Sequence, residues 1–475
     1  MARFAPAMRG ELERLIGAEH VLGAPADSPY NADSARRRGL VGRADAVALP
    51  GSADEVAAVV RWCYANDVAI VPRGGGTGVL GGAVPSDGGV VLSLERLRGI
   101  RELEPTLWRI YPEAGVSTRD VQRLARENGL FFGPDPGAAE QSQIGGNVAT
   151  NAGGPHAFKH GVTGAWVTGL EVVLAPGELV QIGGWGRKDV AGYDLKSLLI
   201  GSEGTLGVIT AVRLRLLPAP EAELTLVVFL PDRASGCAAM LDVLAAGIEP
   251  AALDFLDAQT LALVRGAYPG DVPEGAGFVL LIELDGSRGE VERERAELVE
   301  ALGGAPLAIE QPRDAAALWR WRDGFNGVVS GARGAKVSED VAFPLERLRE
   351  GLERFERIAV SHGLSSCGWG HGGDGNVHAT VLVDPSDVAE LDAADAVGAE
   401  LFELVAELGG SIAAEHGVGL LKGGLLAAQW DARTVQLHEQ IKRAFDPKGL
   451  LNPGKKLART AARDATRQLP TRPAS

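Results

Sequence analysis

The chain has 475 residues and a net charge of −15, with 45% hydrophobic and 23% charged residues. These values indicate an ordinary globular protein of two or three domains, and they argue against nucleic acid as a partner. Its cysteines, Cys63, Cys237 and Cys367, have a spacing that suits neither a disulfide framework nor a cysteine-bound iron–sulfur cluster. We therefore expect a reducing, cytoplasmic compartment.

Neither a signal peptide nor a membrane span is expected. Residues 1–17 mix Arg and Glu with apolar side chains, so they lack the apolar core of a signal peptide. No apolar run approaches the roughly 20 residues that a transmembrane helix needs. Any association with a membrane would be peripheral and would go through a partner.

Residues 44–218 alternate short apolar runs with glycine-rich loops. We predict strands over residues 46–49, 68–72, 169–175 and 207–217. Ser52–Glu55 is a capping-box sequence, which predicts a helix that runs to about Asn66. Pro218 and Pro220 mark a domain boundary.

A mixture of strand and helix patterns follows this boundary and indicates an α+β fold class. We predict strands over 224–230 and 278–284, and helices over 289–302, 389–408 and 432–445. Gly303 and Gly304 supply a C-cap for the helix that ends at Leu302. The predicted domains are residues 1–218 and 219–410, followed by a C-terminal segment over 411–458 and a disordered tail over 459–475.

Gly76–Gly81 matches the G-x-G-x-x-G pattern of dinucleotide-binding proteins. A Rossmann fold requires a helix to start at this loop, and residues 82–89 are too rich in Gly and Pro to start one. We therefore reject the Rossmann fold. The glycines can still form a nest of backbone N–H groups that binds phosphate, and a merely flexible loop is the alternative.

Further glycine-rich loops are predicted over residues 132–137, 144–154, 192–195 and 201–207. In the second of these, Asn147, Thr150 and Asn151 can hydrogen-bond polar ring edges or ribitol hydroxyls. Such loop systems within one domain favour a single large, flat ligand that carries phosphate.

His371-Gly-Gly-Asp-Gly-Asn-Val-His378 is the most informative motif in the chain. An odd separation would place the two histidines on opposite faces of a regular strand, so the residues between them must form a turn. Two imidazoles and a carboxylate such as Glu415 suit a divalent metal, and the adjacent His416 is then left to act as a base. The alternative is that these histidines are polar turn residues.

Arg322 follows Trp319-Arg-Trp and can bind a substrate carboxylate at two points, as a guanidinium does and an ammonium does not. The alternative is a surface arginine on a helix.

Four motifs then resemble one known family: residues 71–78, 144–154, 201–207 and 452–455. They are similar to the FAD-binding signatures of the vanillyl-alcohol-oxidase superfamily, also called PCMH-type, and the resemblance covers residues 28–456. It is strongest to the branch of D-2-hydroxy-acid dehydrogenases, which includes the glycolate oxidase flavoprotein subunit, D-lactate dehydrogenases and D-2-hydroxyglutarate dehydrogenase. This implies a PCMH-type FAD-binding domain and an α+β substrate-binding domain of the FAD-linked oxidase type, with residues 411–458 completing the active site.

The resemblance also implies a role for individual residues. His371, His378 and Glu415 would bind Zn2+ or Mn2+, His416 would be the catalytic base and Arg322 would bind the substrate carboxylate. The implied FAD-binding residues are Pro72, Arg73, Gly74, Gly75, Gly76, Thr77, Gly78, Pro134, Asp135, Gly145, Gly146, Asn147, Asn151, Gly153, Gly154, Glu203, Gly204, Ile209 and Asn452. Non-covalent FAD is expected, although His156 and His160 follow these motifs.

The implied reaction is the oxidation of a small D-2-hydroxy acid to the 2-oxo acid, with hydride transfer to flavin N5. Relatives that oxidise D-2-hydroxyglutarate have an asparagine where this chain has Thr380, and their substrate lysine falls near Ser338, with Lys336 close by. These departures favour D-lactate or glycolate. Electrons would pass to an external acceptor, which is a partner subunit, an electron-transfer flavoprotein or a quinone, and a homodimer is compatible with the sequence.

Several alternatives stay open. One is a non-redox flavoprotein transferase similar to alkyl-dihydroxyacetonephosphate synthase, and another is a D-2-hydroxyglutarate dehydrogenase. A metal hydrolase or non-haem iron protein could use the same His, His and Glu set. The last alternative is a structural subunit that bears a flavin but whose chemistry lies elsewhere.

Overall fold

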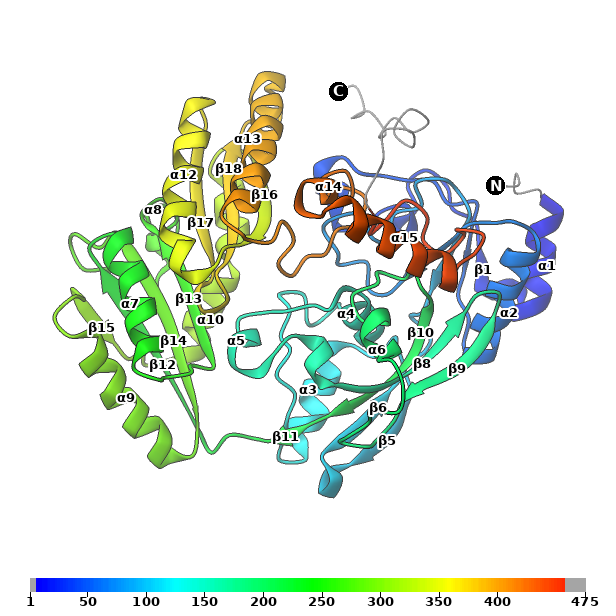
Figure 1. Cartoon of the computed structure of the whole chain (residues 1–475), viewed down its shortest axis with the longest axis horizontal. Helices are drawn as coiled ribbons and strands as arrows, with labels where there is room; N and C mark the ends of the chain where they lie inside the picture. Colours follow the sequence, from blue (N-terminus) through cyan, green and yellow to red (C-terminus); the bar gives the residue numbers. More distant parts are fainter. Residues whose placement is uncertain (1–5, 458–475) are drawn as a thin grey trace. The chain divides into compact units, whose positions relative to one another are not determined.

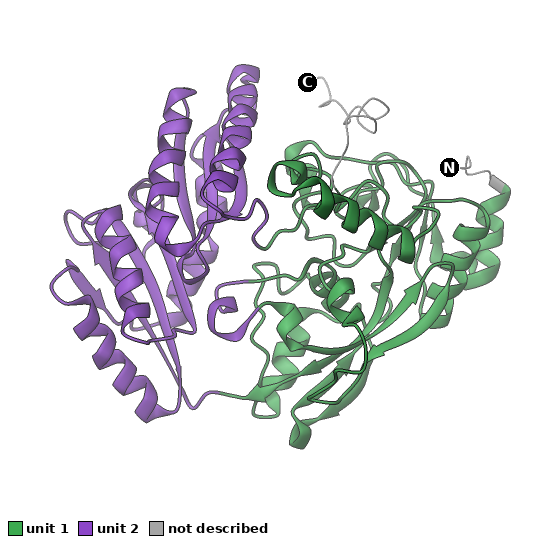
Figure 2. Ribbon diagram, in the orientation of Figure 1, with its two compact units in different colours: residues 1–153, 162–219, 415–475 green, residues 154–161, 220–414 purple. Residues whose placement is uncertain are grey.

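The computed structural model describes residues 6–457 (Figure 1). The chain divides into two compact units, and neither is a contiguous stretch of sequence (Figure 2). The first unit comprises Met1–Gly153, Val162–Ala219 and Glu415–Ser475, and the second comprises Gly154–Gly161 and Pro220–Ala414. The tail over 459–475, which is predicted to be disordered, lies outside the described residues.

The first unit contains a small sheet with parallel pairing on both sides of its strand β4. In spatial order its strands are β1 (Val21–Leu22), β2 (Ala46–Ala48), β4 (Val90–Ser93) and β3 (Ile70–Arg73), with β1 antiparallel to β2. The helices α1 (Pro6–Ile16) and α2 (Ala53–Ala65) share a hydrophobic core with this sheet.

A second sheet of the first unit is antiparallel throughout. Its strands are β5 (Ile100–Glu104), β6 (Arg109–Pro112), β10 (Val208–Arg215), β8 (Val167–Leu174) and β9 (Glu178–Gly183), and β11 (Leu217–Pro218) pairs separately with β7 (Leu130–Phe131). The other helices of this unit are α3 (Thr118–Glu127), α4 (Ile144–Thr150), α6 (Leu195–Leu199), α14 (Leu426–Gln429) and α15 (Ala432–Phe445).

The second unit is built on one antiparallel sheet. Its strands are β15 (Ala308–Glu310), β12 (Ala222–Leu230), β14 (Phe278–Gly286), β13 (Ala252–Asp257), β17 (Ser365–His371), β18 (Asn376–Val383) and β16 (Ala335–Ala342). Its helices are α5 (Ala157–His160), α7 (Arg233–Ala245), α8 (Ala258–Val264), α9 (Arg288–Leu302), α10 (Ala315–Asp323), α11 (Phe325–Gly331), α12 (Leu348–Ser361) and α13 (Val388–Glu407).

Short 3₁₀ helices lie between these elements. They are η1 (Ala18–His20), η2 (Pro29–Asn31), η3 (Ser34–Arg38), η4 (Pro105–Leu107), η5 (Thr163–Trp166), η6 (Arg265–Ala267), η7 (Leu345–Arg347) and η8 (Gly372–Asp374). Within residues 6–457, none of the helices has the length and apolar character that crossing a bilayer requires.

The two faces of the large sheet carry different side chains because strand residues alternate. On one face, helix α7 packs so closely on Phe278 that a Cβ at Gly236 would lie 2.1 Å from its ring. On the other face, Leu256 and Trp369 share a core with residues of α8, α10 and α11. Asp254 is two residues before Leu256 in the same strand, so it shares the face that α10 covers.

The helix predicted from Ser52–Glu55 is confirmed as α2, but its capping box is only half formed, and one loop prediction is wrong. The Ser52 hydroxyl accepts from Glu55 N at 3.2 Å, but the Glu55 carboxylate accepts from Gly51 N at 2.6 Å, so the reciprocal bond of a capping box is missing. Residues 144–154 are predicted to be a loop, but their first part forms α4. A Cβ at Gly145 would lie 2.6 Å from that of Ala114, so this glycine serves close packing of a helix.

The C-terminal segment packs into the core of the small sheet, and the buried carboxylate of Asp446 holds it there. Leu450 and Leu451 belong to the same core cluster as Ile70, whose N–H donates to Leu450 O at 2.8 Å. Asp446 is 1% exposed and accepts from the N–H groups of Leu450 and Leu451. Its carboxylate also accepts short contacts from the Tyr64 hydroxyl and the Lys442 ammonium.

Replacing Asp446 by Ala should therefore strongly destabilise the protein. The change leaves the mostly buried Lys442 ammonium unpaired, and burying an unpaired charge costs about 3–5 kcal/mol. Urea unfolding measures the loss. Glu127→Ala is the matched control, since it removes an exposed contact of 2.8 Å between Arg123 and Glu127 and should change stability little. Equal losses in the two variants would contradict the role given to Asp446.

Candidate active site

His371 and His378 lie on two paired strands joined by a tight turn. Strand β17 ends at His371, the 3₁₀ turn η8 follows, and β18 begins at Asn376. The predicted turn between the histidines is thus confirmed. Both histidines are buried, at 4% and 8% exposure, and their ring centroids are 5.6 Å apart.

Each glycine of this turn has its own steric reason. A Cβ at Gly372 would lie 2.5 Å from Met240 Sδ, and one at Gly373 would lie 2.6 Å from the ring of Phe158. Gly375 has a φ of +66° and leaves only 2.0 Å between a Cβ and the carbonyl oxygen of Phe343. At Gly375 the positive φ and the backbone carbonyl leave room for glycine alone, whereas a Cβ at Gly372 or Gly373 would have to displace a neighbouring side chain.

A buried carboxylate beside His371 was not found from the sequence. Asp254 lies opposite His371 in the register of β13 and β17 and is 2% exposed. Its Oδ1 is 2.7 Å from His371 Nδ1, and its Oδ2 accepts from Arg322 Nε at 2.6 Å. Burial raises the pKa of the Asp254 carboxyl, but Arg322 and His371 outweigh this effect and hold that pKa well below its usual range.

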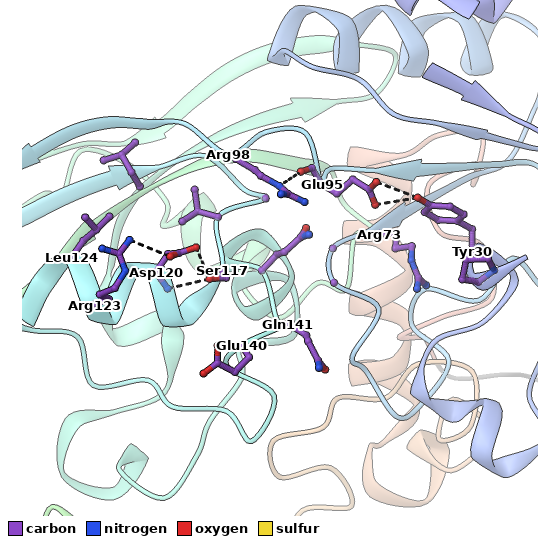
Figure 3. A pocket seen from close by; sticks show the side chains of 17 residues that line it. Tyr30, Arg73, Glu95, Arg98, Ser117, Asp120, Arg123, Leu124, Glu140 and Gln141 are labelled. Carbon is purple, nitrogen blue, oxygen red and sulfur yellow. Dashed lines mark hydrogen bonds and ion pairs between the residues drawn. The ribbon is translucent and has the colours of Figure 1, made fainter. Parts of the chain in front are cut away.

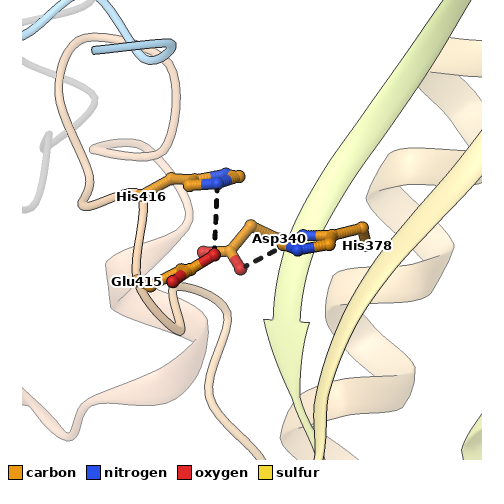
Figure 4. Close-up of side chains that lie close together, drawn as sticks. All are labelled: Asp340, His378, Glu415 and His416. Atoms are coloured by element: carbon orange, nitrogen blue, oxygen red, sulfur yellow. Dashed lines mark ion pairs between the residues drawn. The ribbon is translucent and has the colours of Figure 1, made fainter. Parts of the chain in front are cut away.

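A second buried carboxylate stands beside His378. Asp340 lies opposite His378 in the register of β16 and β18, with 3.9 Å between Asp340 Oδ1 and His378 Nδ1 (Figure 4). Asp340 Oδ1 accepts from Asn376 Nδ2 at 2.7 Å, and Oδ2 accepts from Ala414 N at 3.1 Å. Asp340 therefore holds the backbone of Ala414, which is the last residue of the second unit and directly precedes Glu415.

Glu415 and His416 open the last segment of the first unit. His416 Nε2 is 3.5 Å from Glu415 Oε1, and the two side chains are 38% and 17% exposed (Figure 4). Beyond them, the Glu203 carboxylate accepts from Val418 N at 2.8 Å and from Gly419 N at 2.7 Å. Glu203, which the resemblance assigns to FAD, thus fixes the backbone two and three residues after His416.

The glycine loop after β3 lines a cavity of the first unit with a volume of about 740 Å³ (Figure 3). Arg73, Gly74 and Gly75 belong to its wall, together with Gln143. Arg73 Nη1 donates to Ala32 O at 2.7 Å. The Gln143 Oε1 atom is buried and has no hydrogen-bond partner within residues 6–457, so it can accept from a ligand. Small-molecule sites have volumes of roughly 300–1,000 Å³, so the cavity can hold part of a dinucleotide.

The other residues implied for FAD differ in whether their side chains already have partners in the protein. Asn147 Nδ2 donates to Thr118 Oγ1 at 2.6 Å, and Asn452 Nδ2 donates to the carbonyls of Gly82 and Glu203. The Asn452 Oδ1 atom is buried without a hydrogen-bond partner in the described chain. Ile209 lies in the hydrophobic core of the second sheet. Gly154, by contrast, belongs to the second unit.

Helix α5 is attached to the second unit by charged contacts. His156 Nε2 is 2.8 Å from Glu283 Oε1, and His160 Nε2 is 2.9 Å from Asp285 Oδ2. Lys159 Nζ donates to Asp285 Oδ1 at 2.5 Å. Both histidines thus contact carboxylates of β14, and non-covalent FAD stays a prediction.

Comparison with known proteins places the chain in a family. A sequence family described as FAD binding domain matches residues 44–183, and one described as FAD linked oxidases, C-terminal domain, matches residues 219–456. Glycolate oxidase subunit GlcD of Bacillus subtilis is 37% identical over 422 residues, which is 88% of this chain and 90% of that protein. D-lactate dehydrogenase of Anaerostipes hadrus is 32% identical over 417 residues, which is 85% of this chain and 87% of that protein.

The structure of p-cresol methylhydroxylase is similar at a TM-score of 0.76 and 18% identity, over 94% of this chain and 96% of that one. This likeness confirms the expected α+β class with a PCMH-type FAD-binding fold. The chain is an FAD-linked oxidoreductase and belongs to the family of FAD-dependent hydroxy-acid dehydrogenases.

Gly375→Ala should distort the turn between the histidines. Alanine at this φ costs about 1–2 kcal/mol in any protein, and the collision with the carbonyl of Phe343 adds to that cost. Gly363→Ala is the control, because Gly363 has a φ of +73° and nothing within 4 Å of a Cβ. Chemical unfolding should show the larger loss for Gly375→Ala. A similar loss in both variants would exclude the steric explanation.

The contacts of Asp285 predict a pH dependence of stability. Burial disfavours the charged carboxylate, but His160 and Lys159 outweigh burial and lower the pKa of Asp285 to about 2 from 3.8. A lowered pKa stabilises the folded state above about pH 4, and this contribution is lost as the pH falls toward 2. The contribution is about 2 kcal/mol. The stability difference between wild type and Asp285→Asn should shrink by this amount between pH 5 and pH 2, whereas parallel curves would refute the assignment.

Proposed function

We propose that the protein oxidises a small D-2-hydroxy acid, of the D-lactate or glycolate type, to the 2-oxo acid with FAD and a divalent metal. The observation that carries this proposal is that the second unit brings Arg322 close to His371 and His378. Asp254 holds Arg322 and His371 on one carboxylate, and the His378 ring centroid is 5.6 Å from that of His371. A cation for the carboxylate of the acid thus lies beside two imidazoles suited to a metal.

The metal would be Zn2+ or Mn2+, held by His371, His378 and Glu415. Two imidazoles and one carboxylate are a suitable donor set, and they leave coordination positions for a substrate. Glu415 is supported as the third ligand by its position directly after Ala414 in the chain. The N–H of Ala414 donates to Asp340, which lies opposite His378 in the strand register. The buried Oδ1 atom of Asn376, in the same hairpin, has no hydrogen-bond partner within residues 6–457.

FAD would be held by the residues that the sequence motifs imply. Arg73, Gly74 and Gly75 line the cavity of the first unit, where bare backbone N–H groups suit a pyrophosphate. The unpartnered acceptor atoms of Gln143 and Asn452 support a ligand with hydrogen-bond donors, as an isoalloxazine and a ribitol chain have.

The chain's own residues would bind the acid and move one proton. When bound, FAD supplies a two-electron acceptor, and the metal supplies a Lewis acid that lowers the pKa of the substrate hydroxyl. Arg322 binds the carboxylate and fixes which hydrogen at the α-carbon can be transferred. His416 accepts the hydroxyl proton on a ring nitrogen as the α-hydrogen leaves with its electron pair, which gives the 2-oxo acid.

The size of the acid is inferred from hydroxyl groups on the sheet. Ser338 and Thr380 face each other, with their hydroxyl oxygens 2.8 Å apart, at positions where D-2-hydroxyglutarate dehydrogenases have a lysine nearby and an asparagine. Lys336 lies with its Nζ 4.4 Å from the centroid of the Trp369 ring. Neither hydroxyl carries a charge that could pair with a second carboxylate, which favours an acid with one carboxylate. Oxidation of D-2-hydroxyglutarate is the second candidate function.

Reduced FAD needs an external oxidant, which we propose to be a partner subunit, an electron-transfer flavoprotein or a quinone. The similar protein of Bacillus subtilis is named as a subunit of glycolate oxidase, which supports a partner subunit. A cytoplasmic location, peripheral to a membrane through that partner, is part of the proposal.

Anaerobic mixing with candidate acids tests the proposal directly. D-lactate or glycolate should bleach the flavin absorbance, and L-lactate and D-2-hydroxyglutarate should do so less efficiently. A chelator should slow bleaching and Zn2+ or Mn2+ should restore it. A flavin that none of these acids bleaches would refute the proposed substrate class, and efficient bleaching by D-2-hydroxyglutarate alone would favour the second candidate.

His416→Ala should lower the bleaching rate by about 10²–10⁴-fold, the usual contribution of a general base. FAD content should be unchanged. His362→Ala is the matched control, since His362 forms an exposed contact of 2.7 Å with Glu400. That variant should bleach at the wild-type rate. Near-normal bleaching by His416→Ala would remove His416 from the mechanism.

A further inference from the structure

We propose that Asp254 is a positioning residue that sets both the metal-binding tautomer of His371 and the orientation of Arg322. The inference rests on the proposed function, because it concerns the proposed metal ligand and the proposed carboxylate-binding arginine. It adds a residue that neither touches the substrate nor binds the metal.

The two oxygens of Asp254 have separate partners. Oδ1 contacts His371 Nδ1 at 2.7 Å and Oδ2 accepts from Arg322 Nε at 2.6 Å. The Asp254 side chain is 3% exposed and those of His371 and Arg322 are 6% and 12% exposed, so water competes little for these contacts. The register of β13 and β17 fixes Asp254 opposite His371.

The contact with His371 determines which ring nitrogen can bind a metal. Nδ1 is 2.7 Å from Asp254 Oδ1 and 3.4 Å from Arg322 Nη2. An ionised carboxylate is only an acceptor and is the nearer neighbour, so we assign the imidazole proton to Nδ1, which donates it to Asp254. The lone pair of a neutral imidazole is then on Nε2, and this atom is the metal ligand. A carboxylate behind a metal-binding histidine also makes the imidazole a better donor.

The contact with Arg322 sets the plane of the guanidinium. Nε is on the side edge of this group, whereas a substrate carboxylate bound end-on uses the two Nη atoms. Because the same carboxylate holds His371, a displacement of Asp254 moves the metal ligand and the carboxylate-binding group together.

Asp254→Asn tests this role, because an amide can satisfy only one of the two contacts. If Asn Oδ1 accepts from Arg322 Nε, its NH2 group faces His371 Nδ1 and requires that atom to be an acceptor. The proton of His371 then moves to Nε2, and the metal-binding lone pair is lost. We expect Zn2+ affinity, measured by chelator competition on the purified flavoprotein, to fall about 10–100-fold. The KM for the hydroxy acid should rise, with FAD content unchanged.

Asp257→Asn is the matched control. Asp257 lies on the same strand, is 5% exposed, and accepts from Thr260 N at 2.8 Å at the start of α8. It should lower the unfolding temperature and leave Zn2+ affinity unchanged. A merely structural role of Asp254 predicts the same pattern for Asp254→Asn. Unchanged Zn2+ affinity in that variant would overturn the inference.

If Asp254→Asn does not fold, Asp254→Glu tests the same positioning role. It retains two acceptor oxygens on a longer side chain, so its Zn2+ affinity should recover partly while KM stays raised. Full wild-type values for both quantities would contradict a positioning role. A wild-type protein that binds no Zn2+ or Mn2+ would instead contradict the metal in the proposed function, and this inference with it.

Discussion

One buried negative charge organises the candidate site. A carboxylate that is 2% exposed is costly to desolvate unless each oxygen has a charged or donating partner, and Asp254 meets this condition through His371 and Arg322. Arg322 neutralises this charge and His371 donates a hydrogen bond to it, so one carboxylate holds the two residues that most need exact placement. Removing either one would leave one oxygen of Asp254 without its partner, so the three side chains form one energetic unit.

Steric exclusion complements this electrostatic arrangement. The turn that connects the histidines is enclosed by Met240, Phe158 and the carbonyl of Phe343, each within 2.6 Å of a Cβ that glycine lacks. Phe158 belongs to α5, which charged contacts attach to strand β14. The residues that enclose the turn therefore come from three distant parts of the sequence. These close contacts restrict the backbone conformation between the two histidines.

The sequence was sufficient where the signal was local. The turn between His371 and His378 followed from an odd spacing and three glycines, and the span of α15 from its helical pattern. The sequence does not reveal Asp254 and Asp340, because only the strand register places them opposite the histidines. Asp254 and His371 are 117 residues apart in the sequence. An acidic residue amid apolar strand residues was the one available signal. The loop prediction over 144–154 failed because Gly145 serves helix packing, which glycine content alone does not reveal.

The discontinuous first unit has a consequence for synthesis on the ribosome. The second unit has all of its residues once Ala414 has emerged, whereas the first unit still lacks Leu450 and Leu451 from its core. The nascent chain must therefore hold an unfinished apolar surface around Ile70 until its final segment arrives. The later-encoded unit can reach its native state first, which reverses the usual N-terminal-first order of vectorial folding.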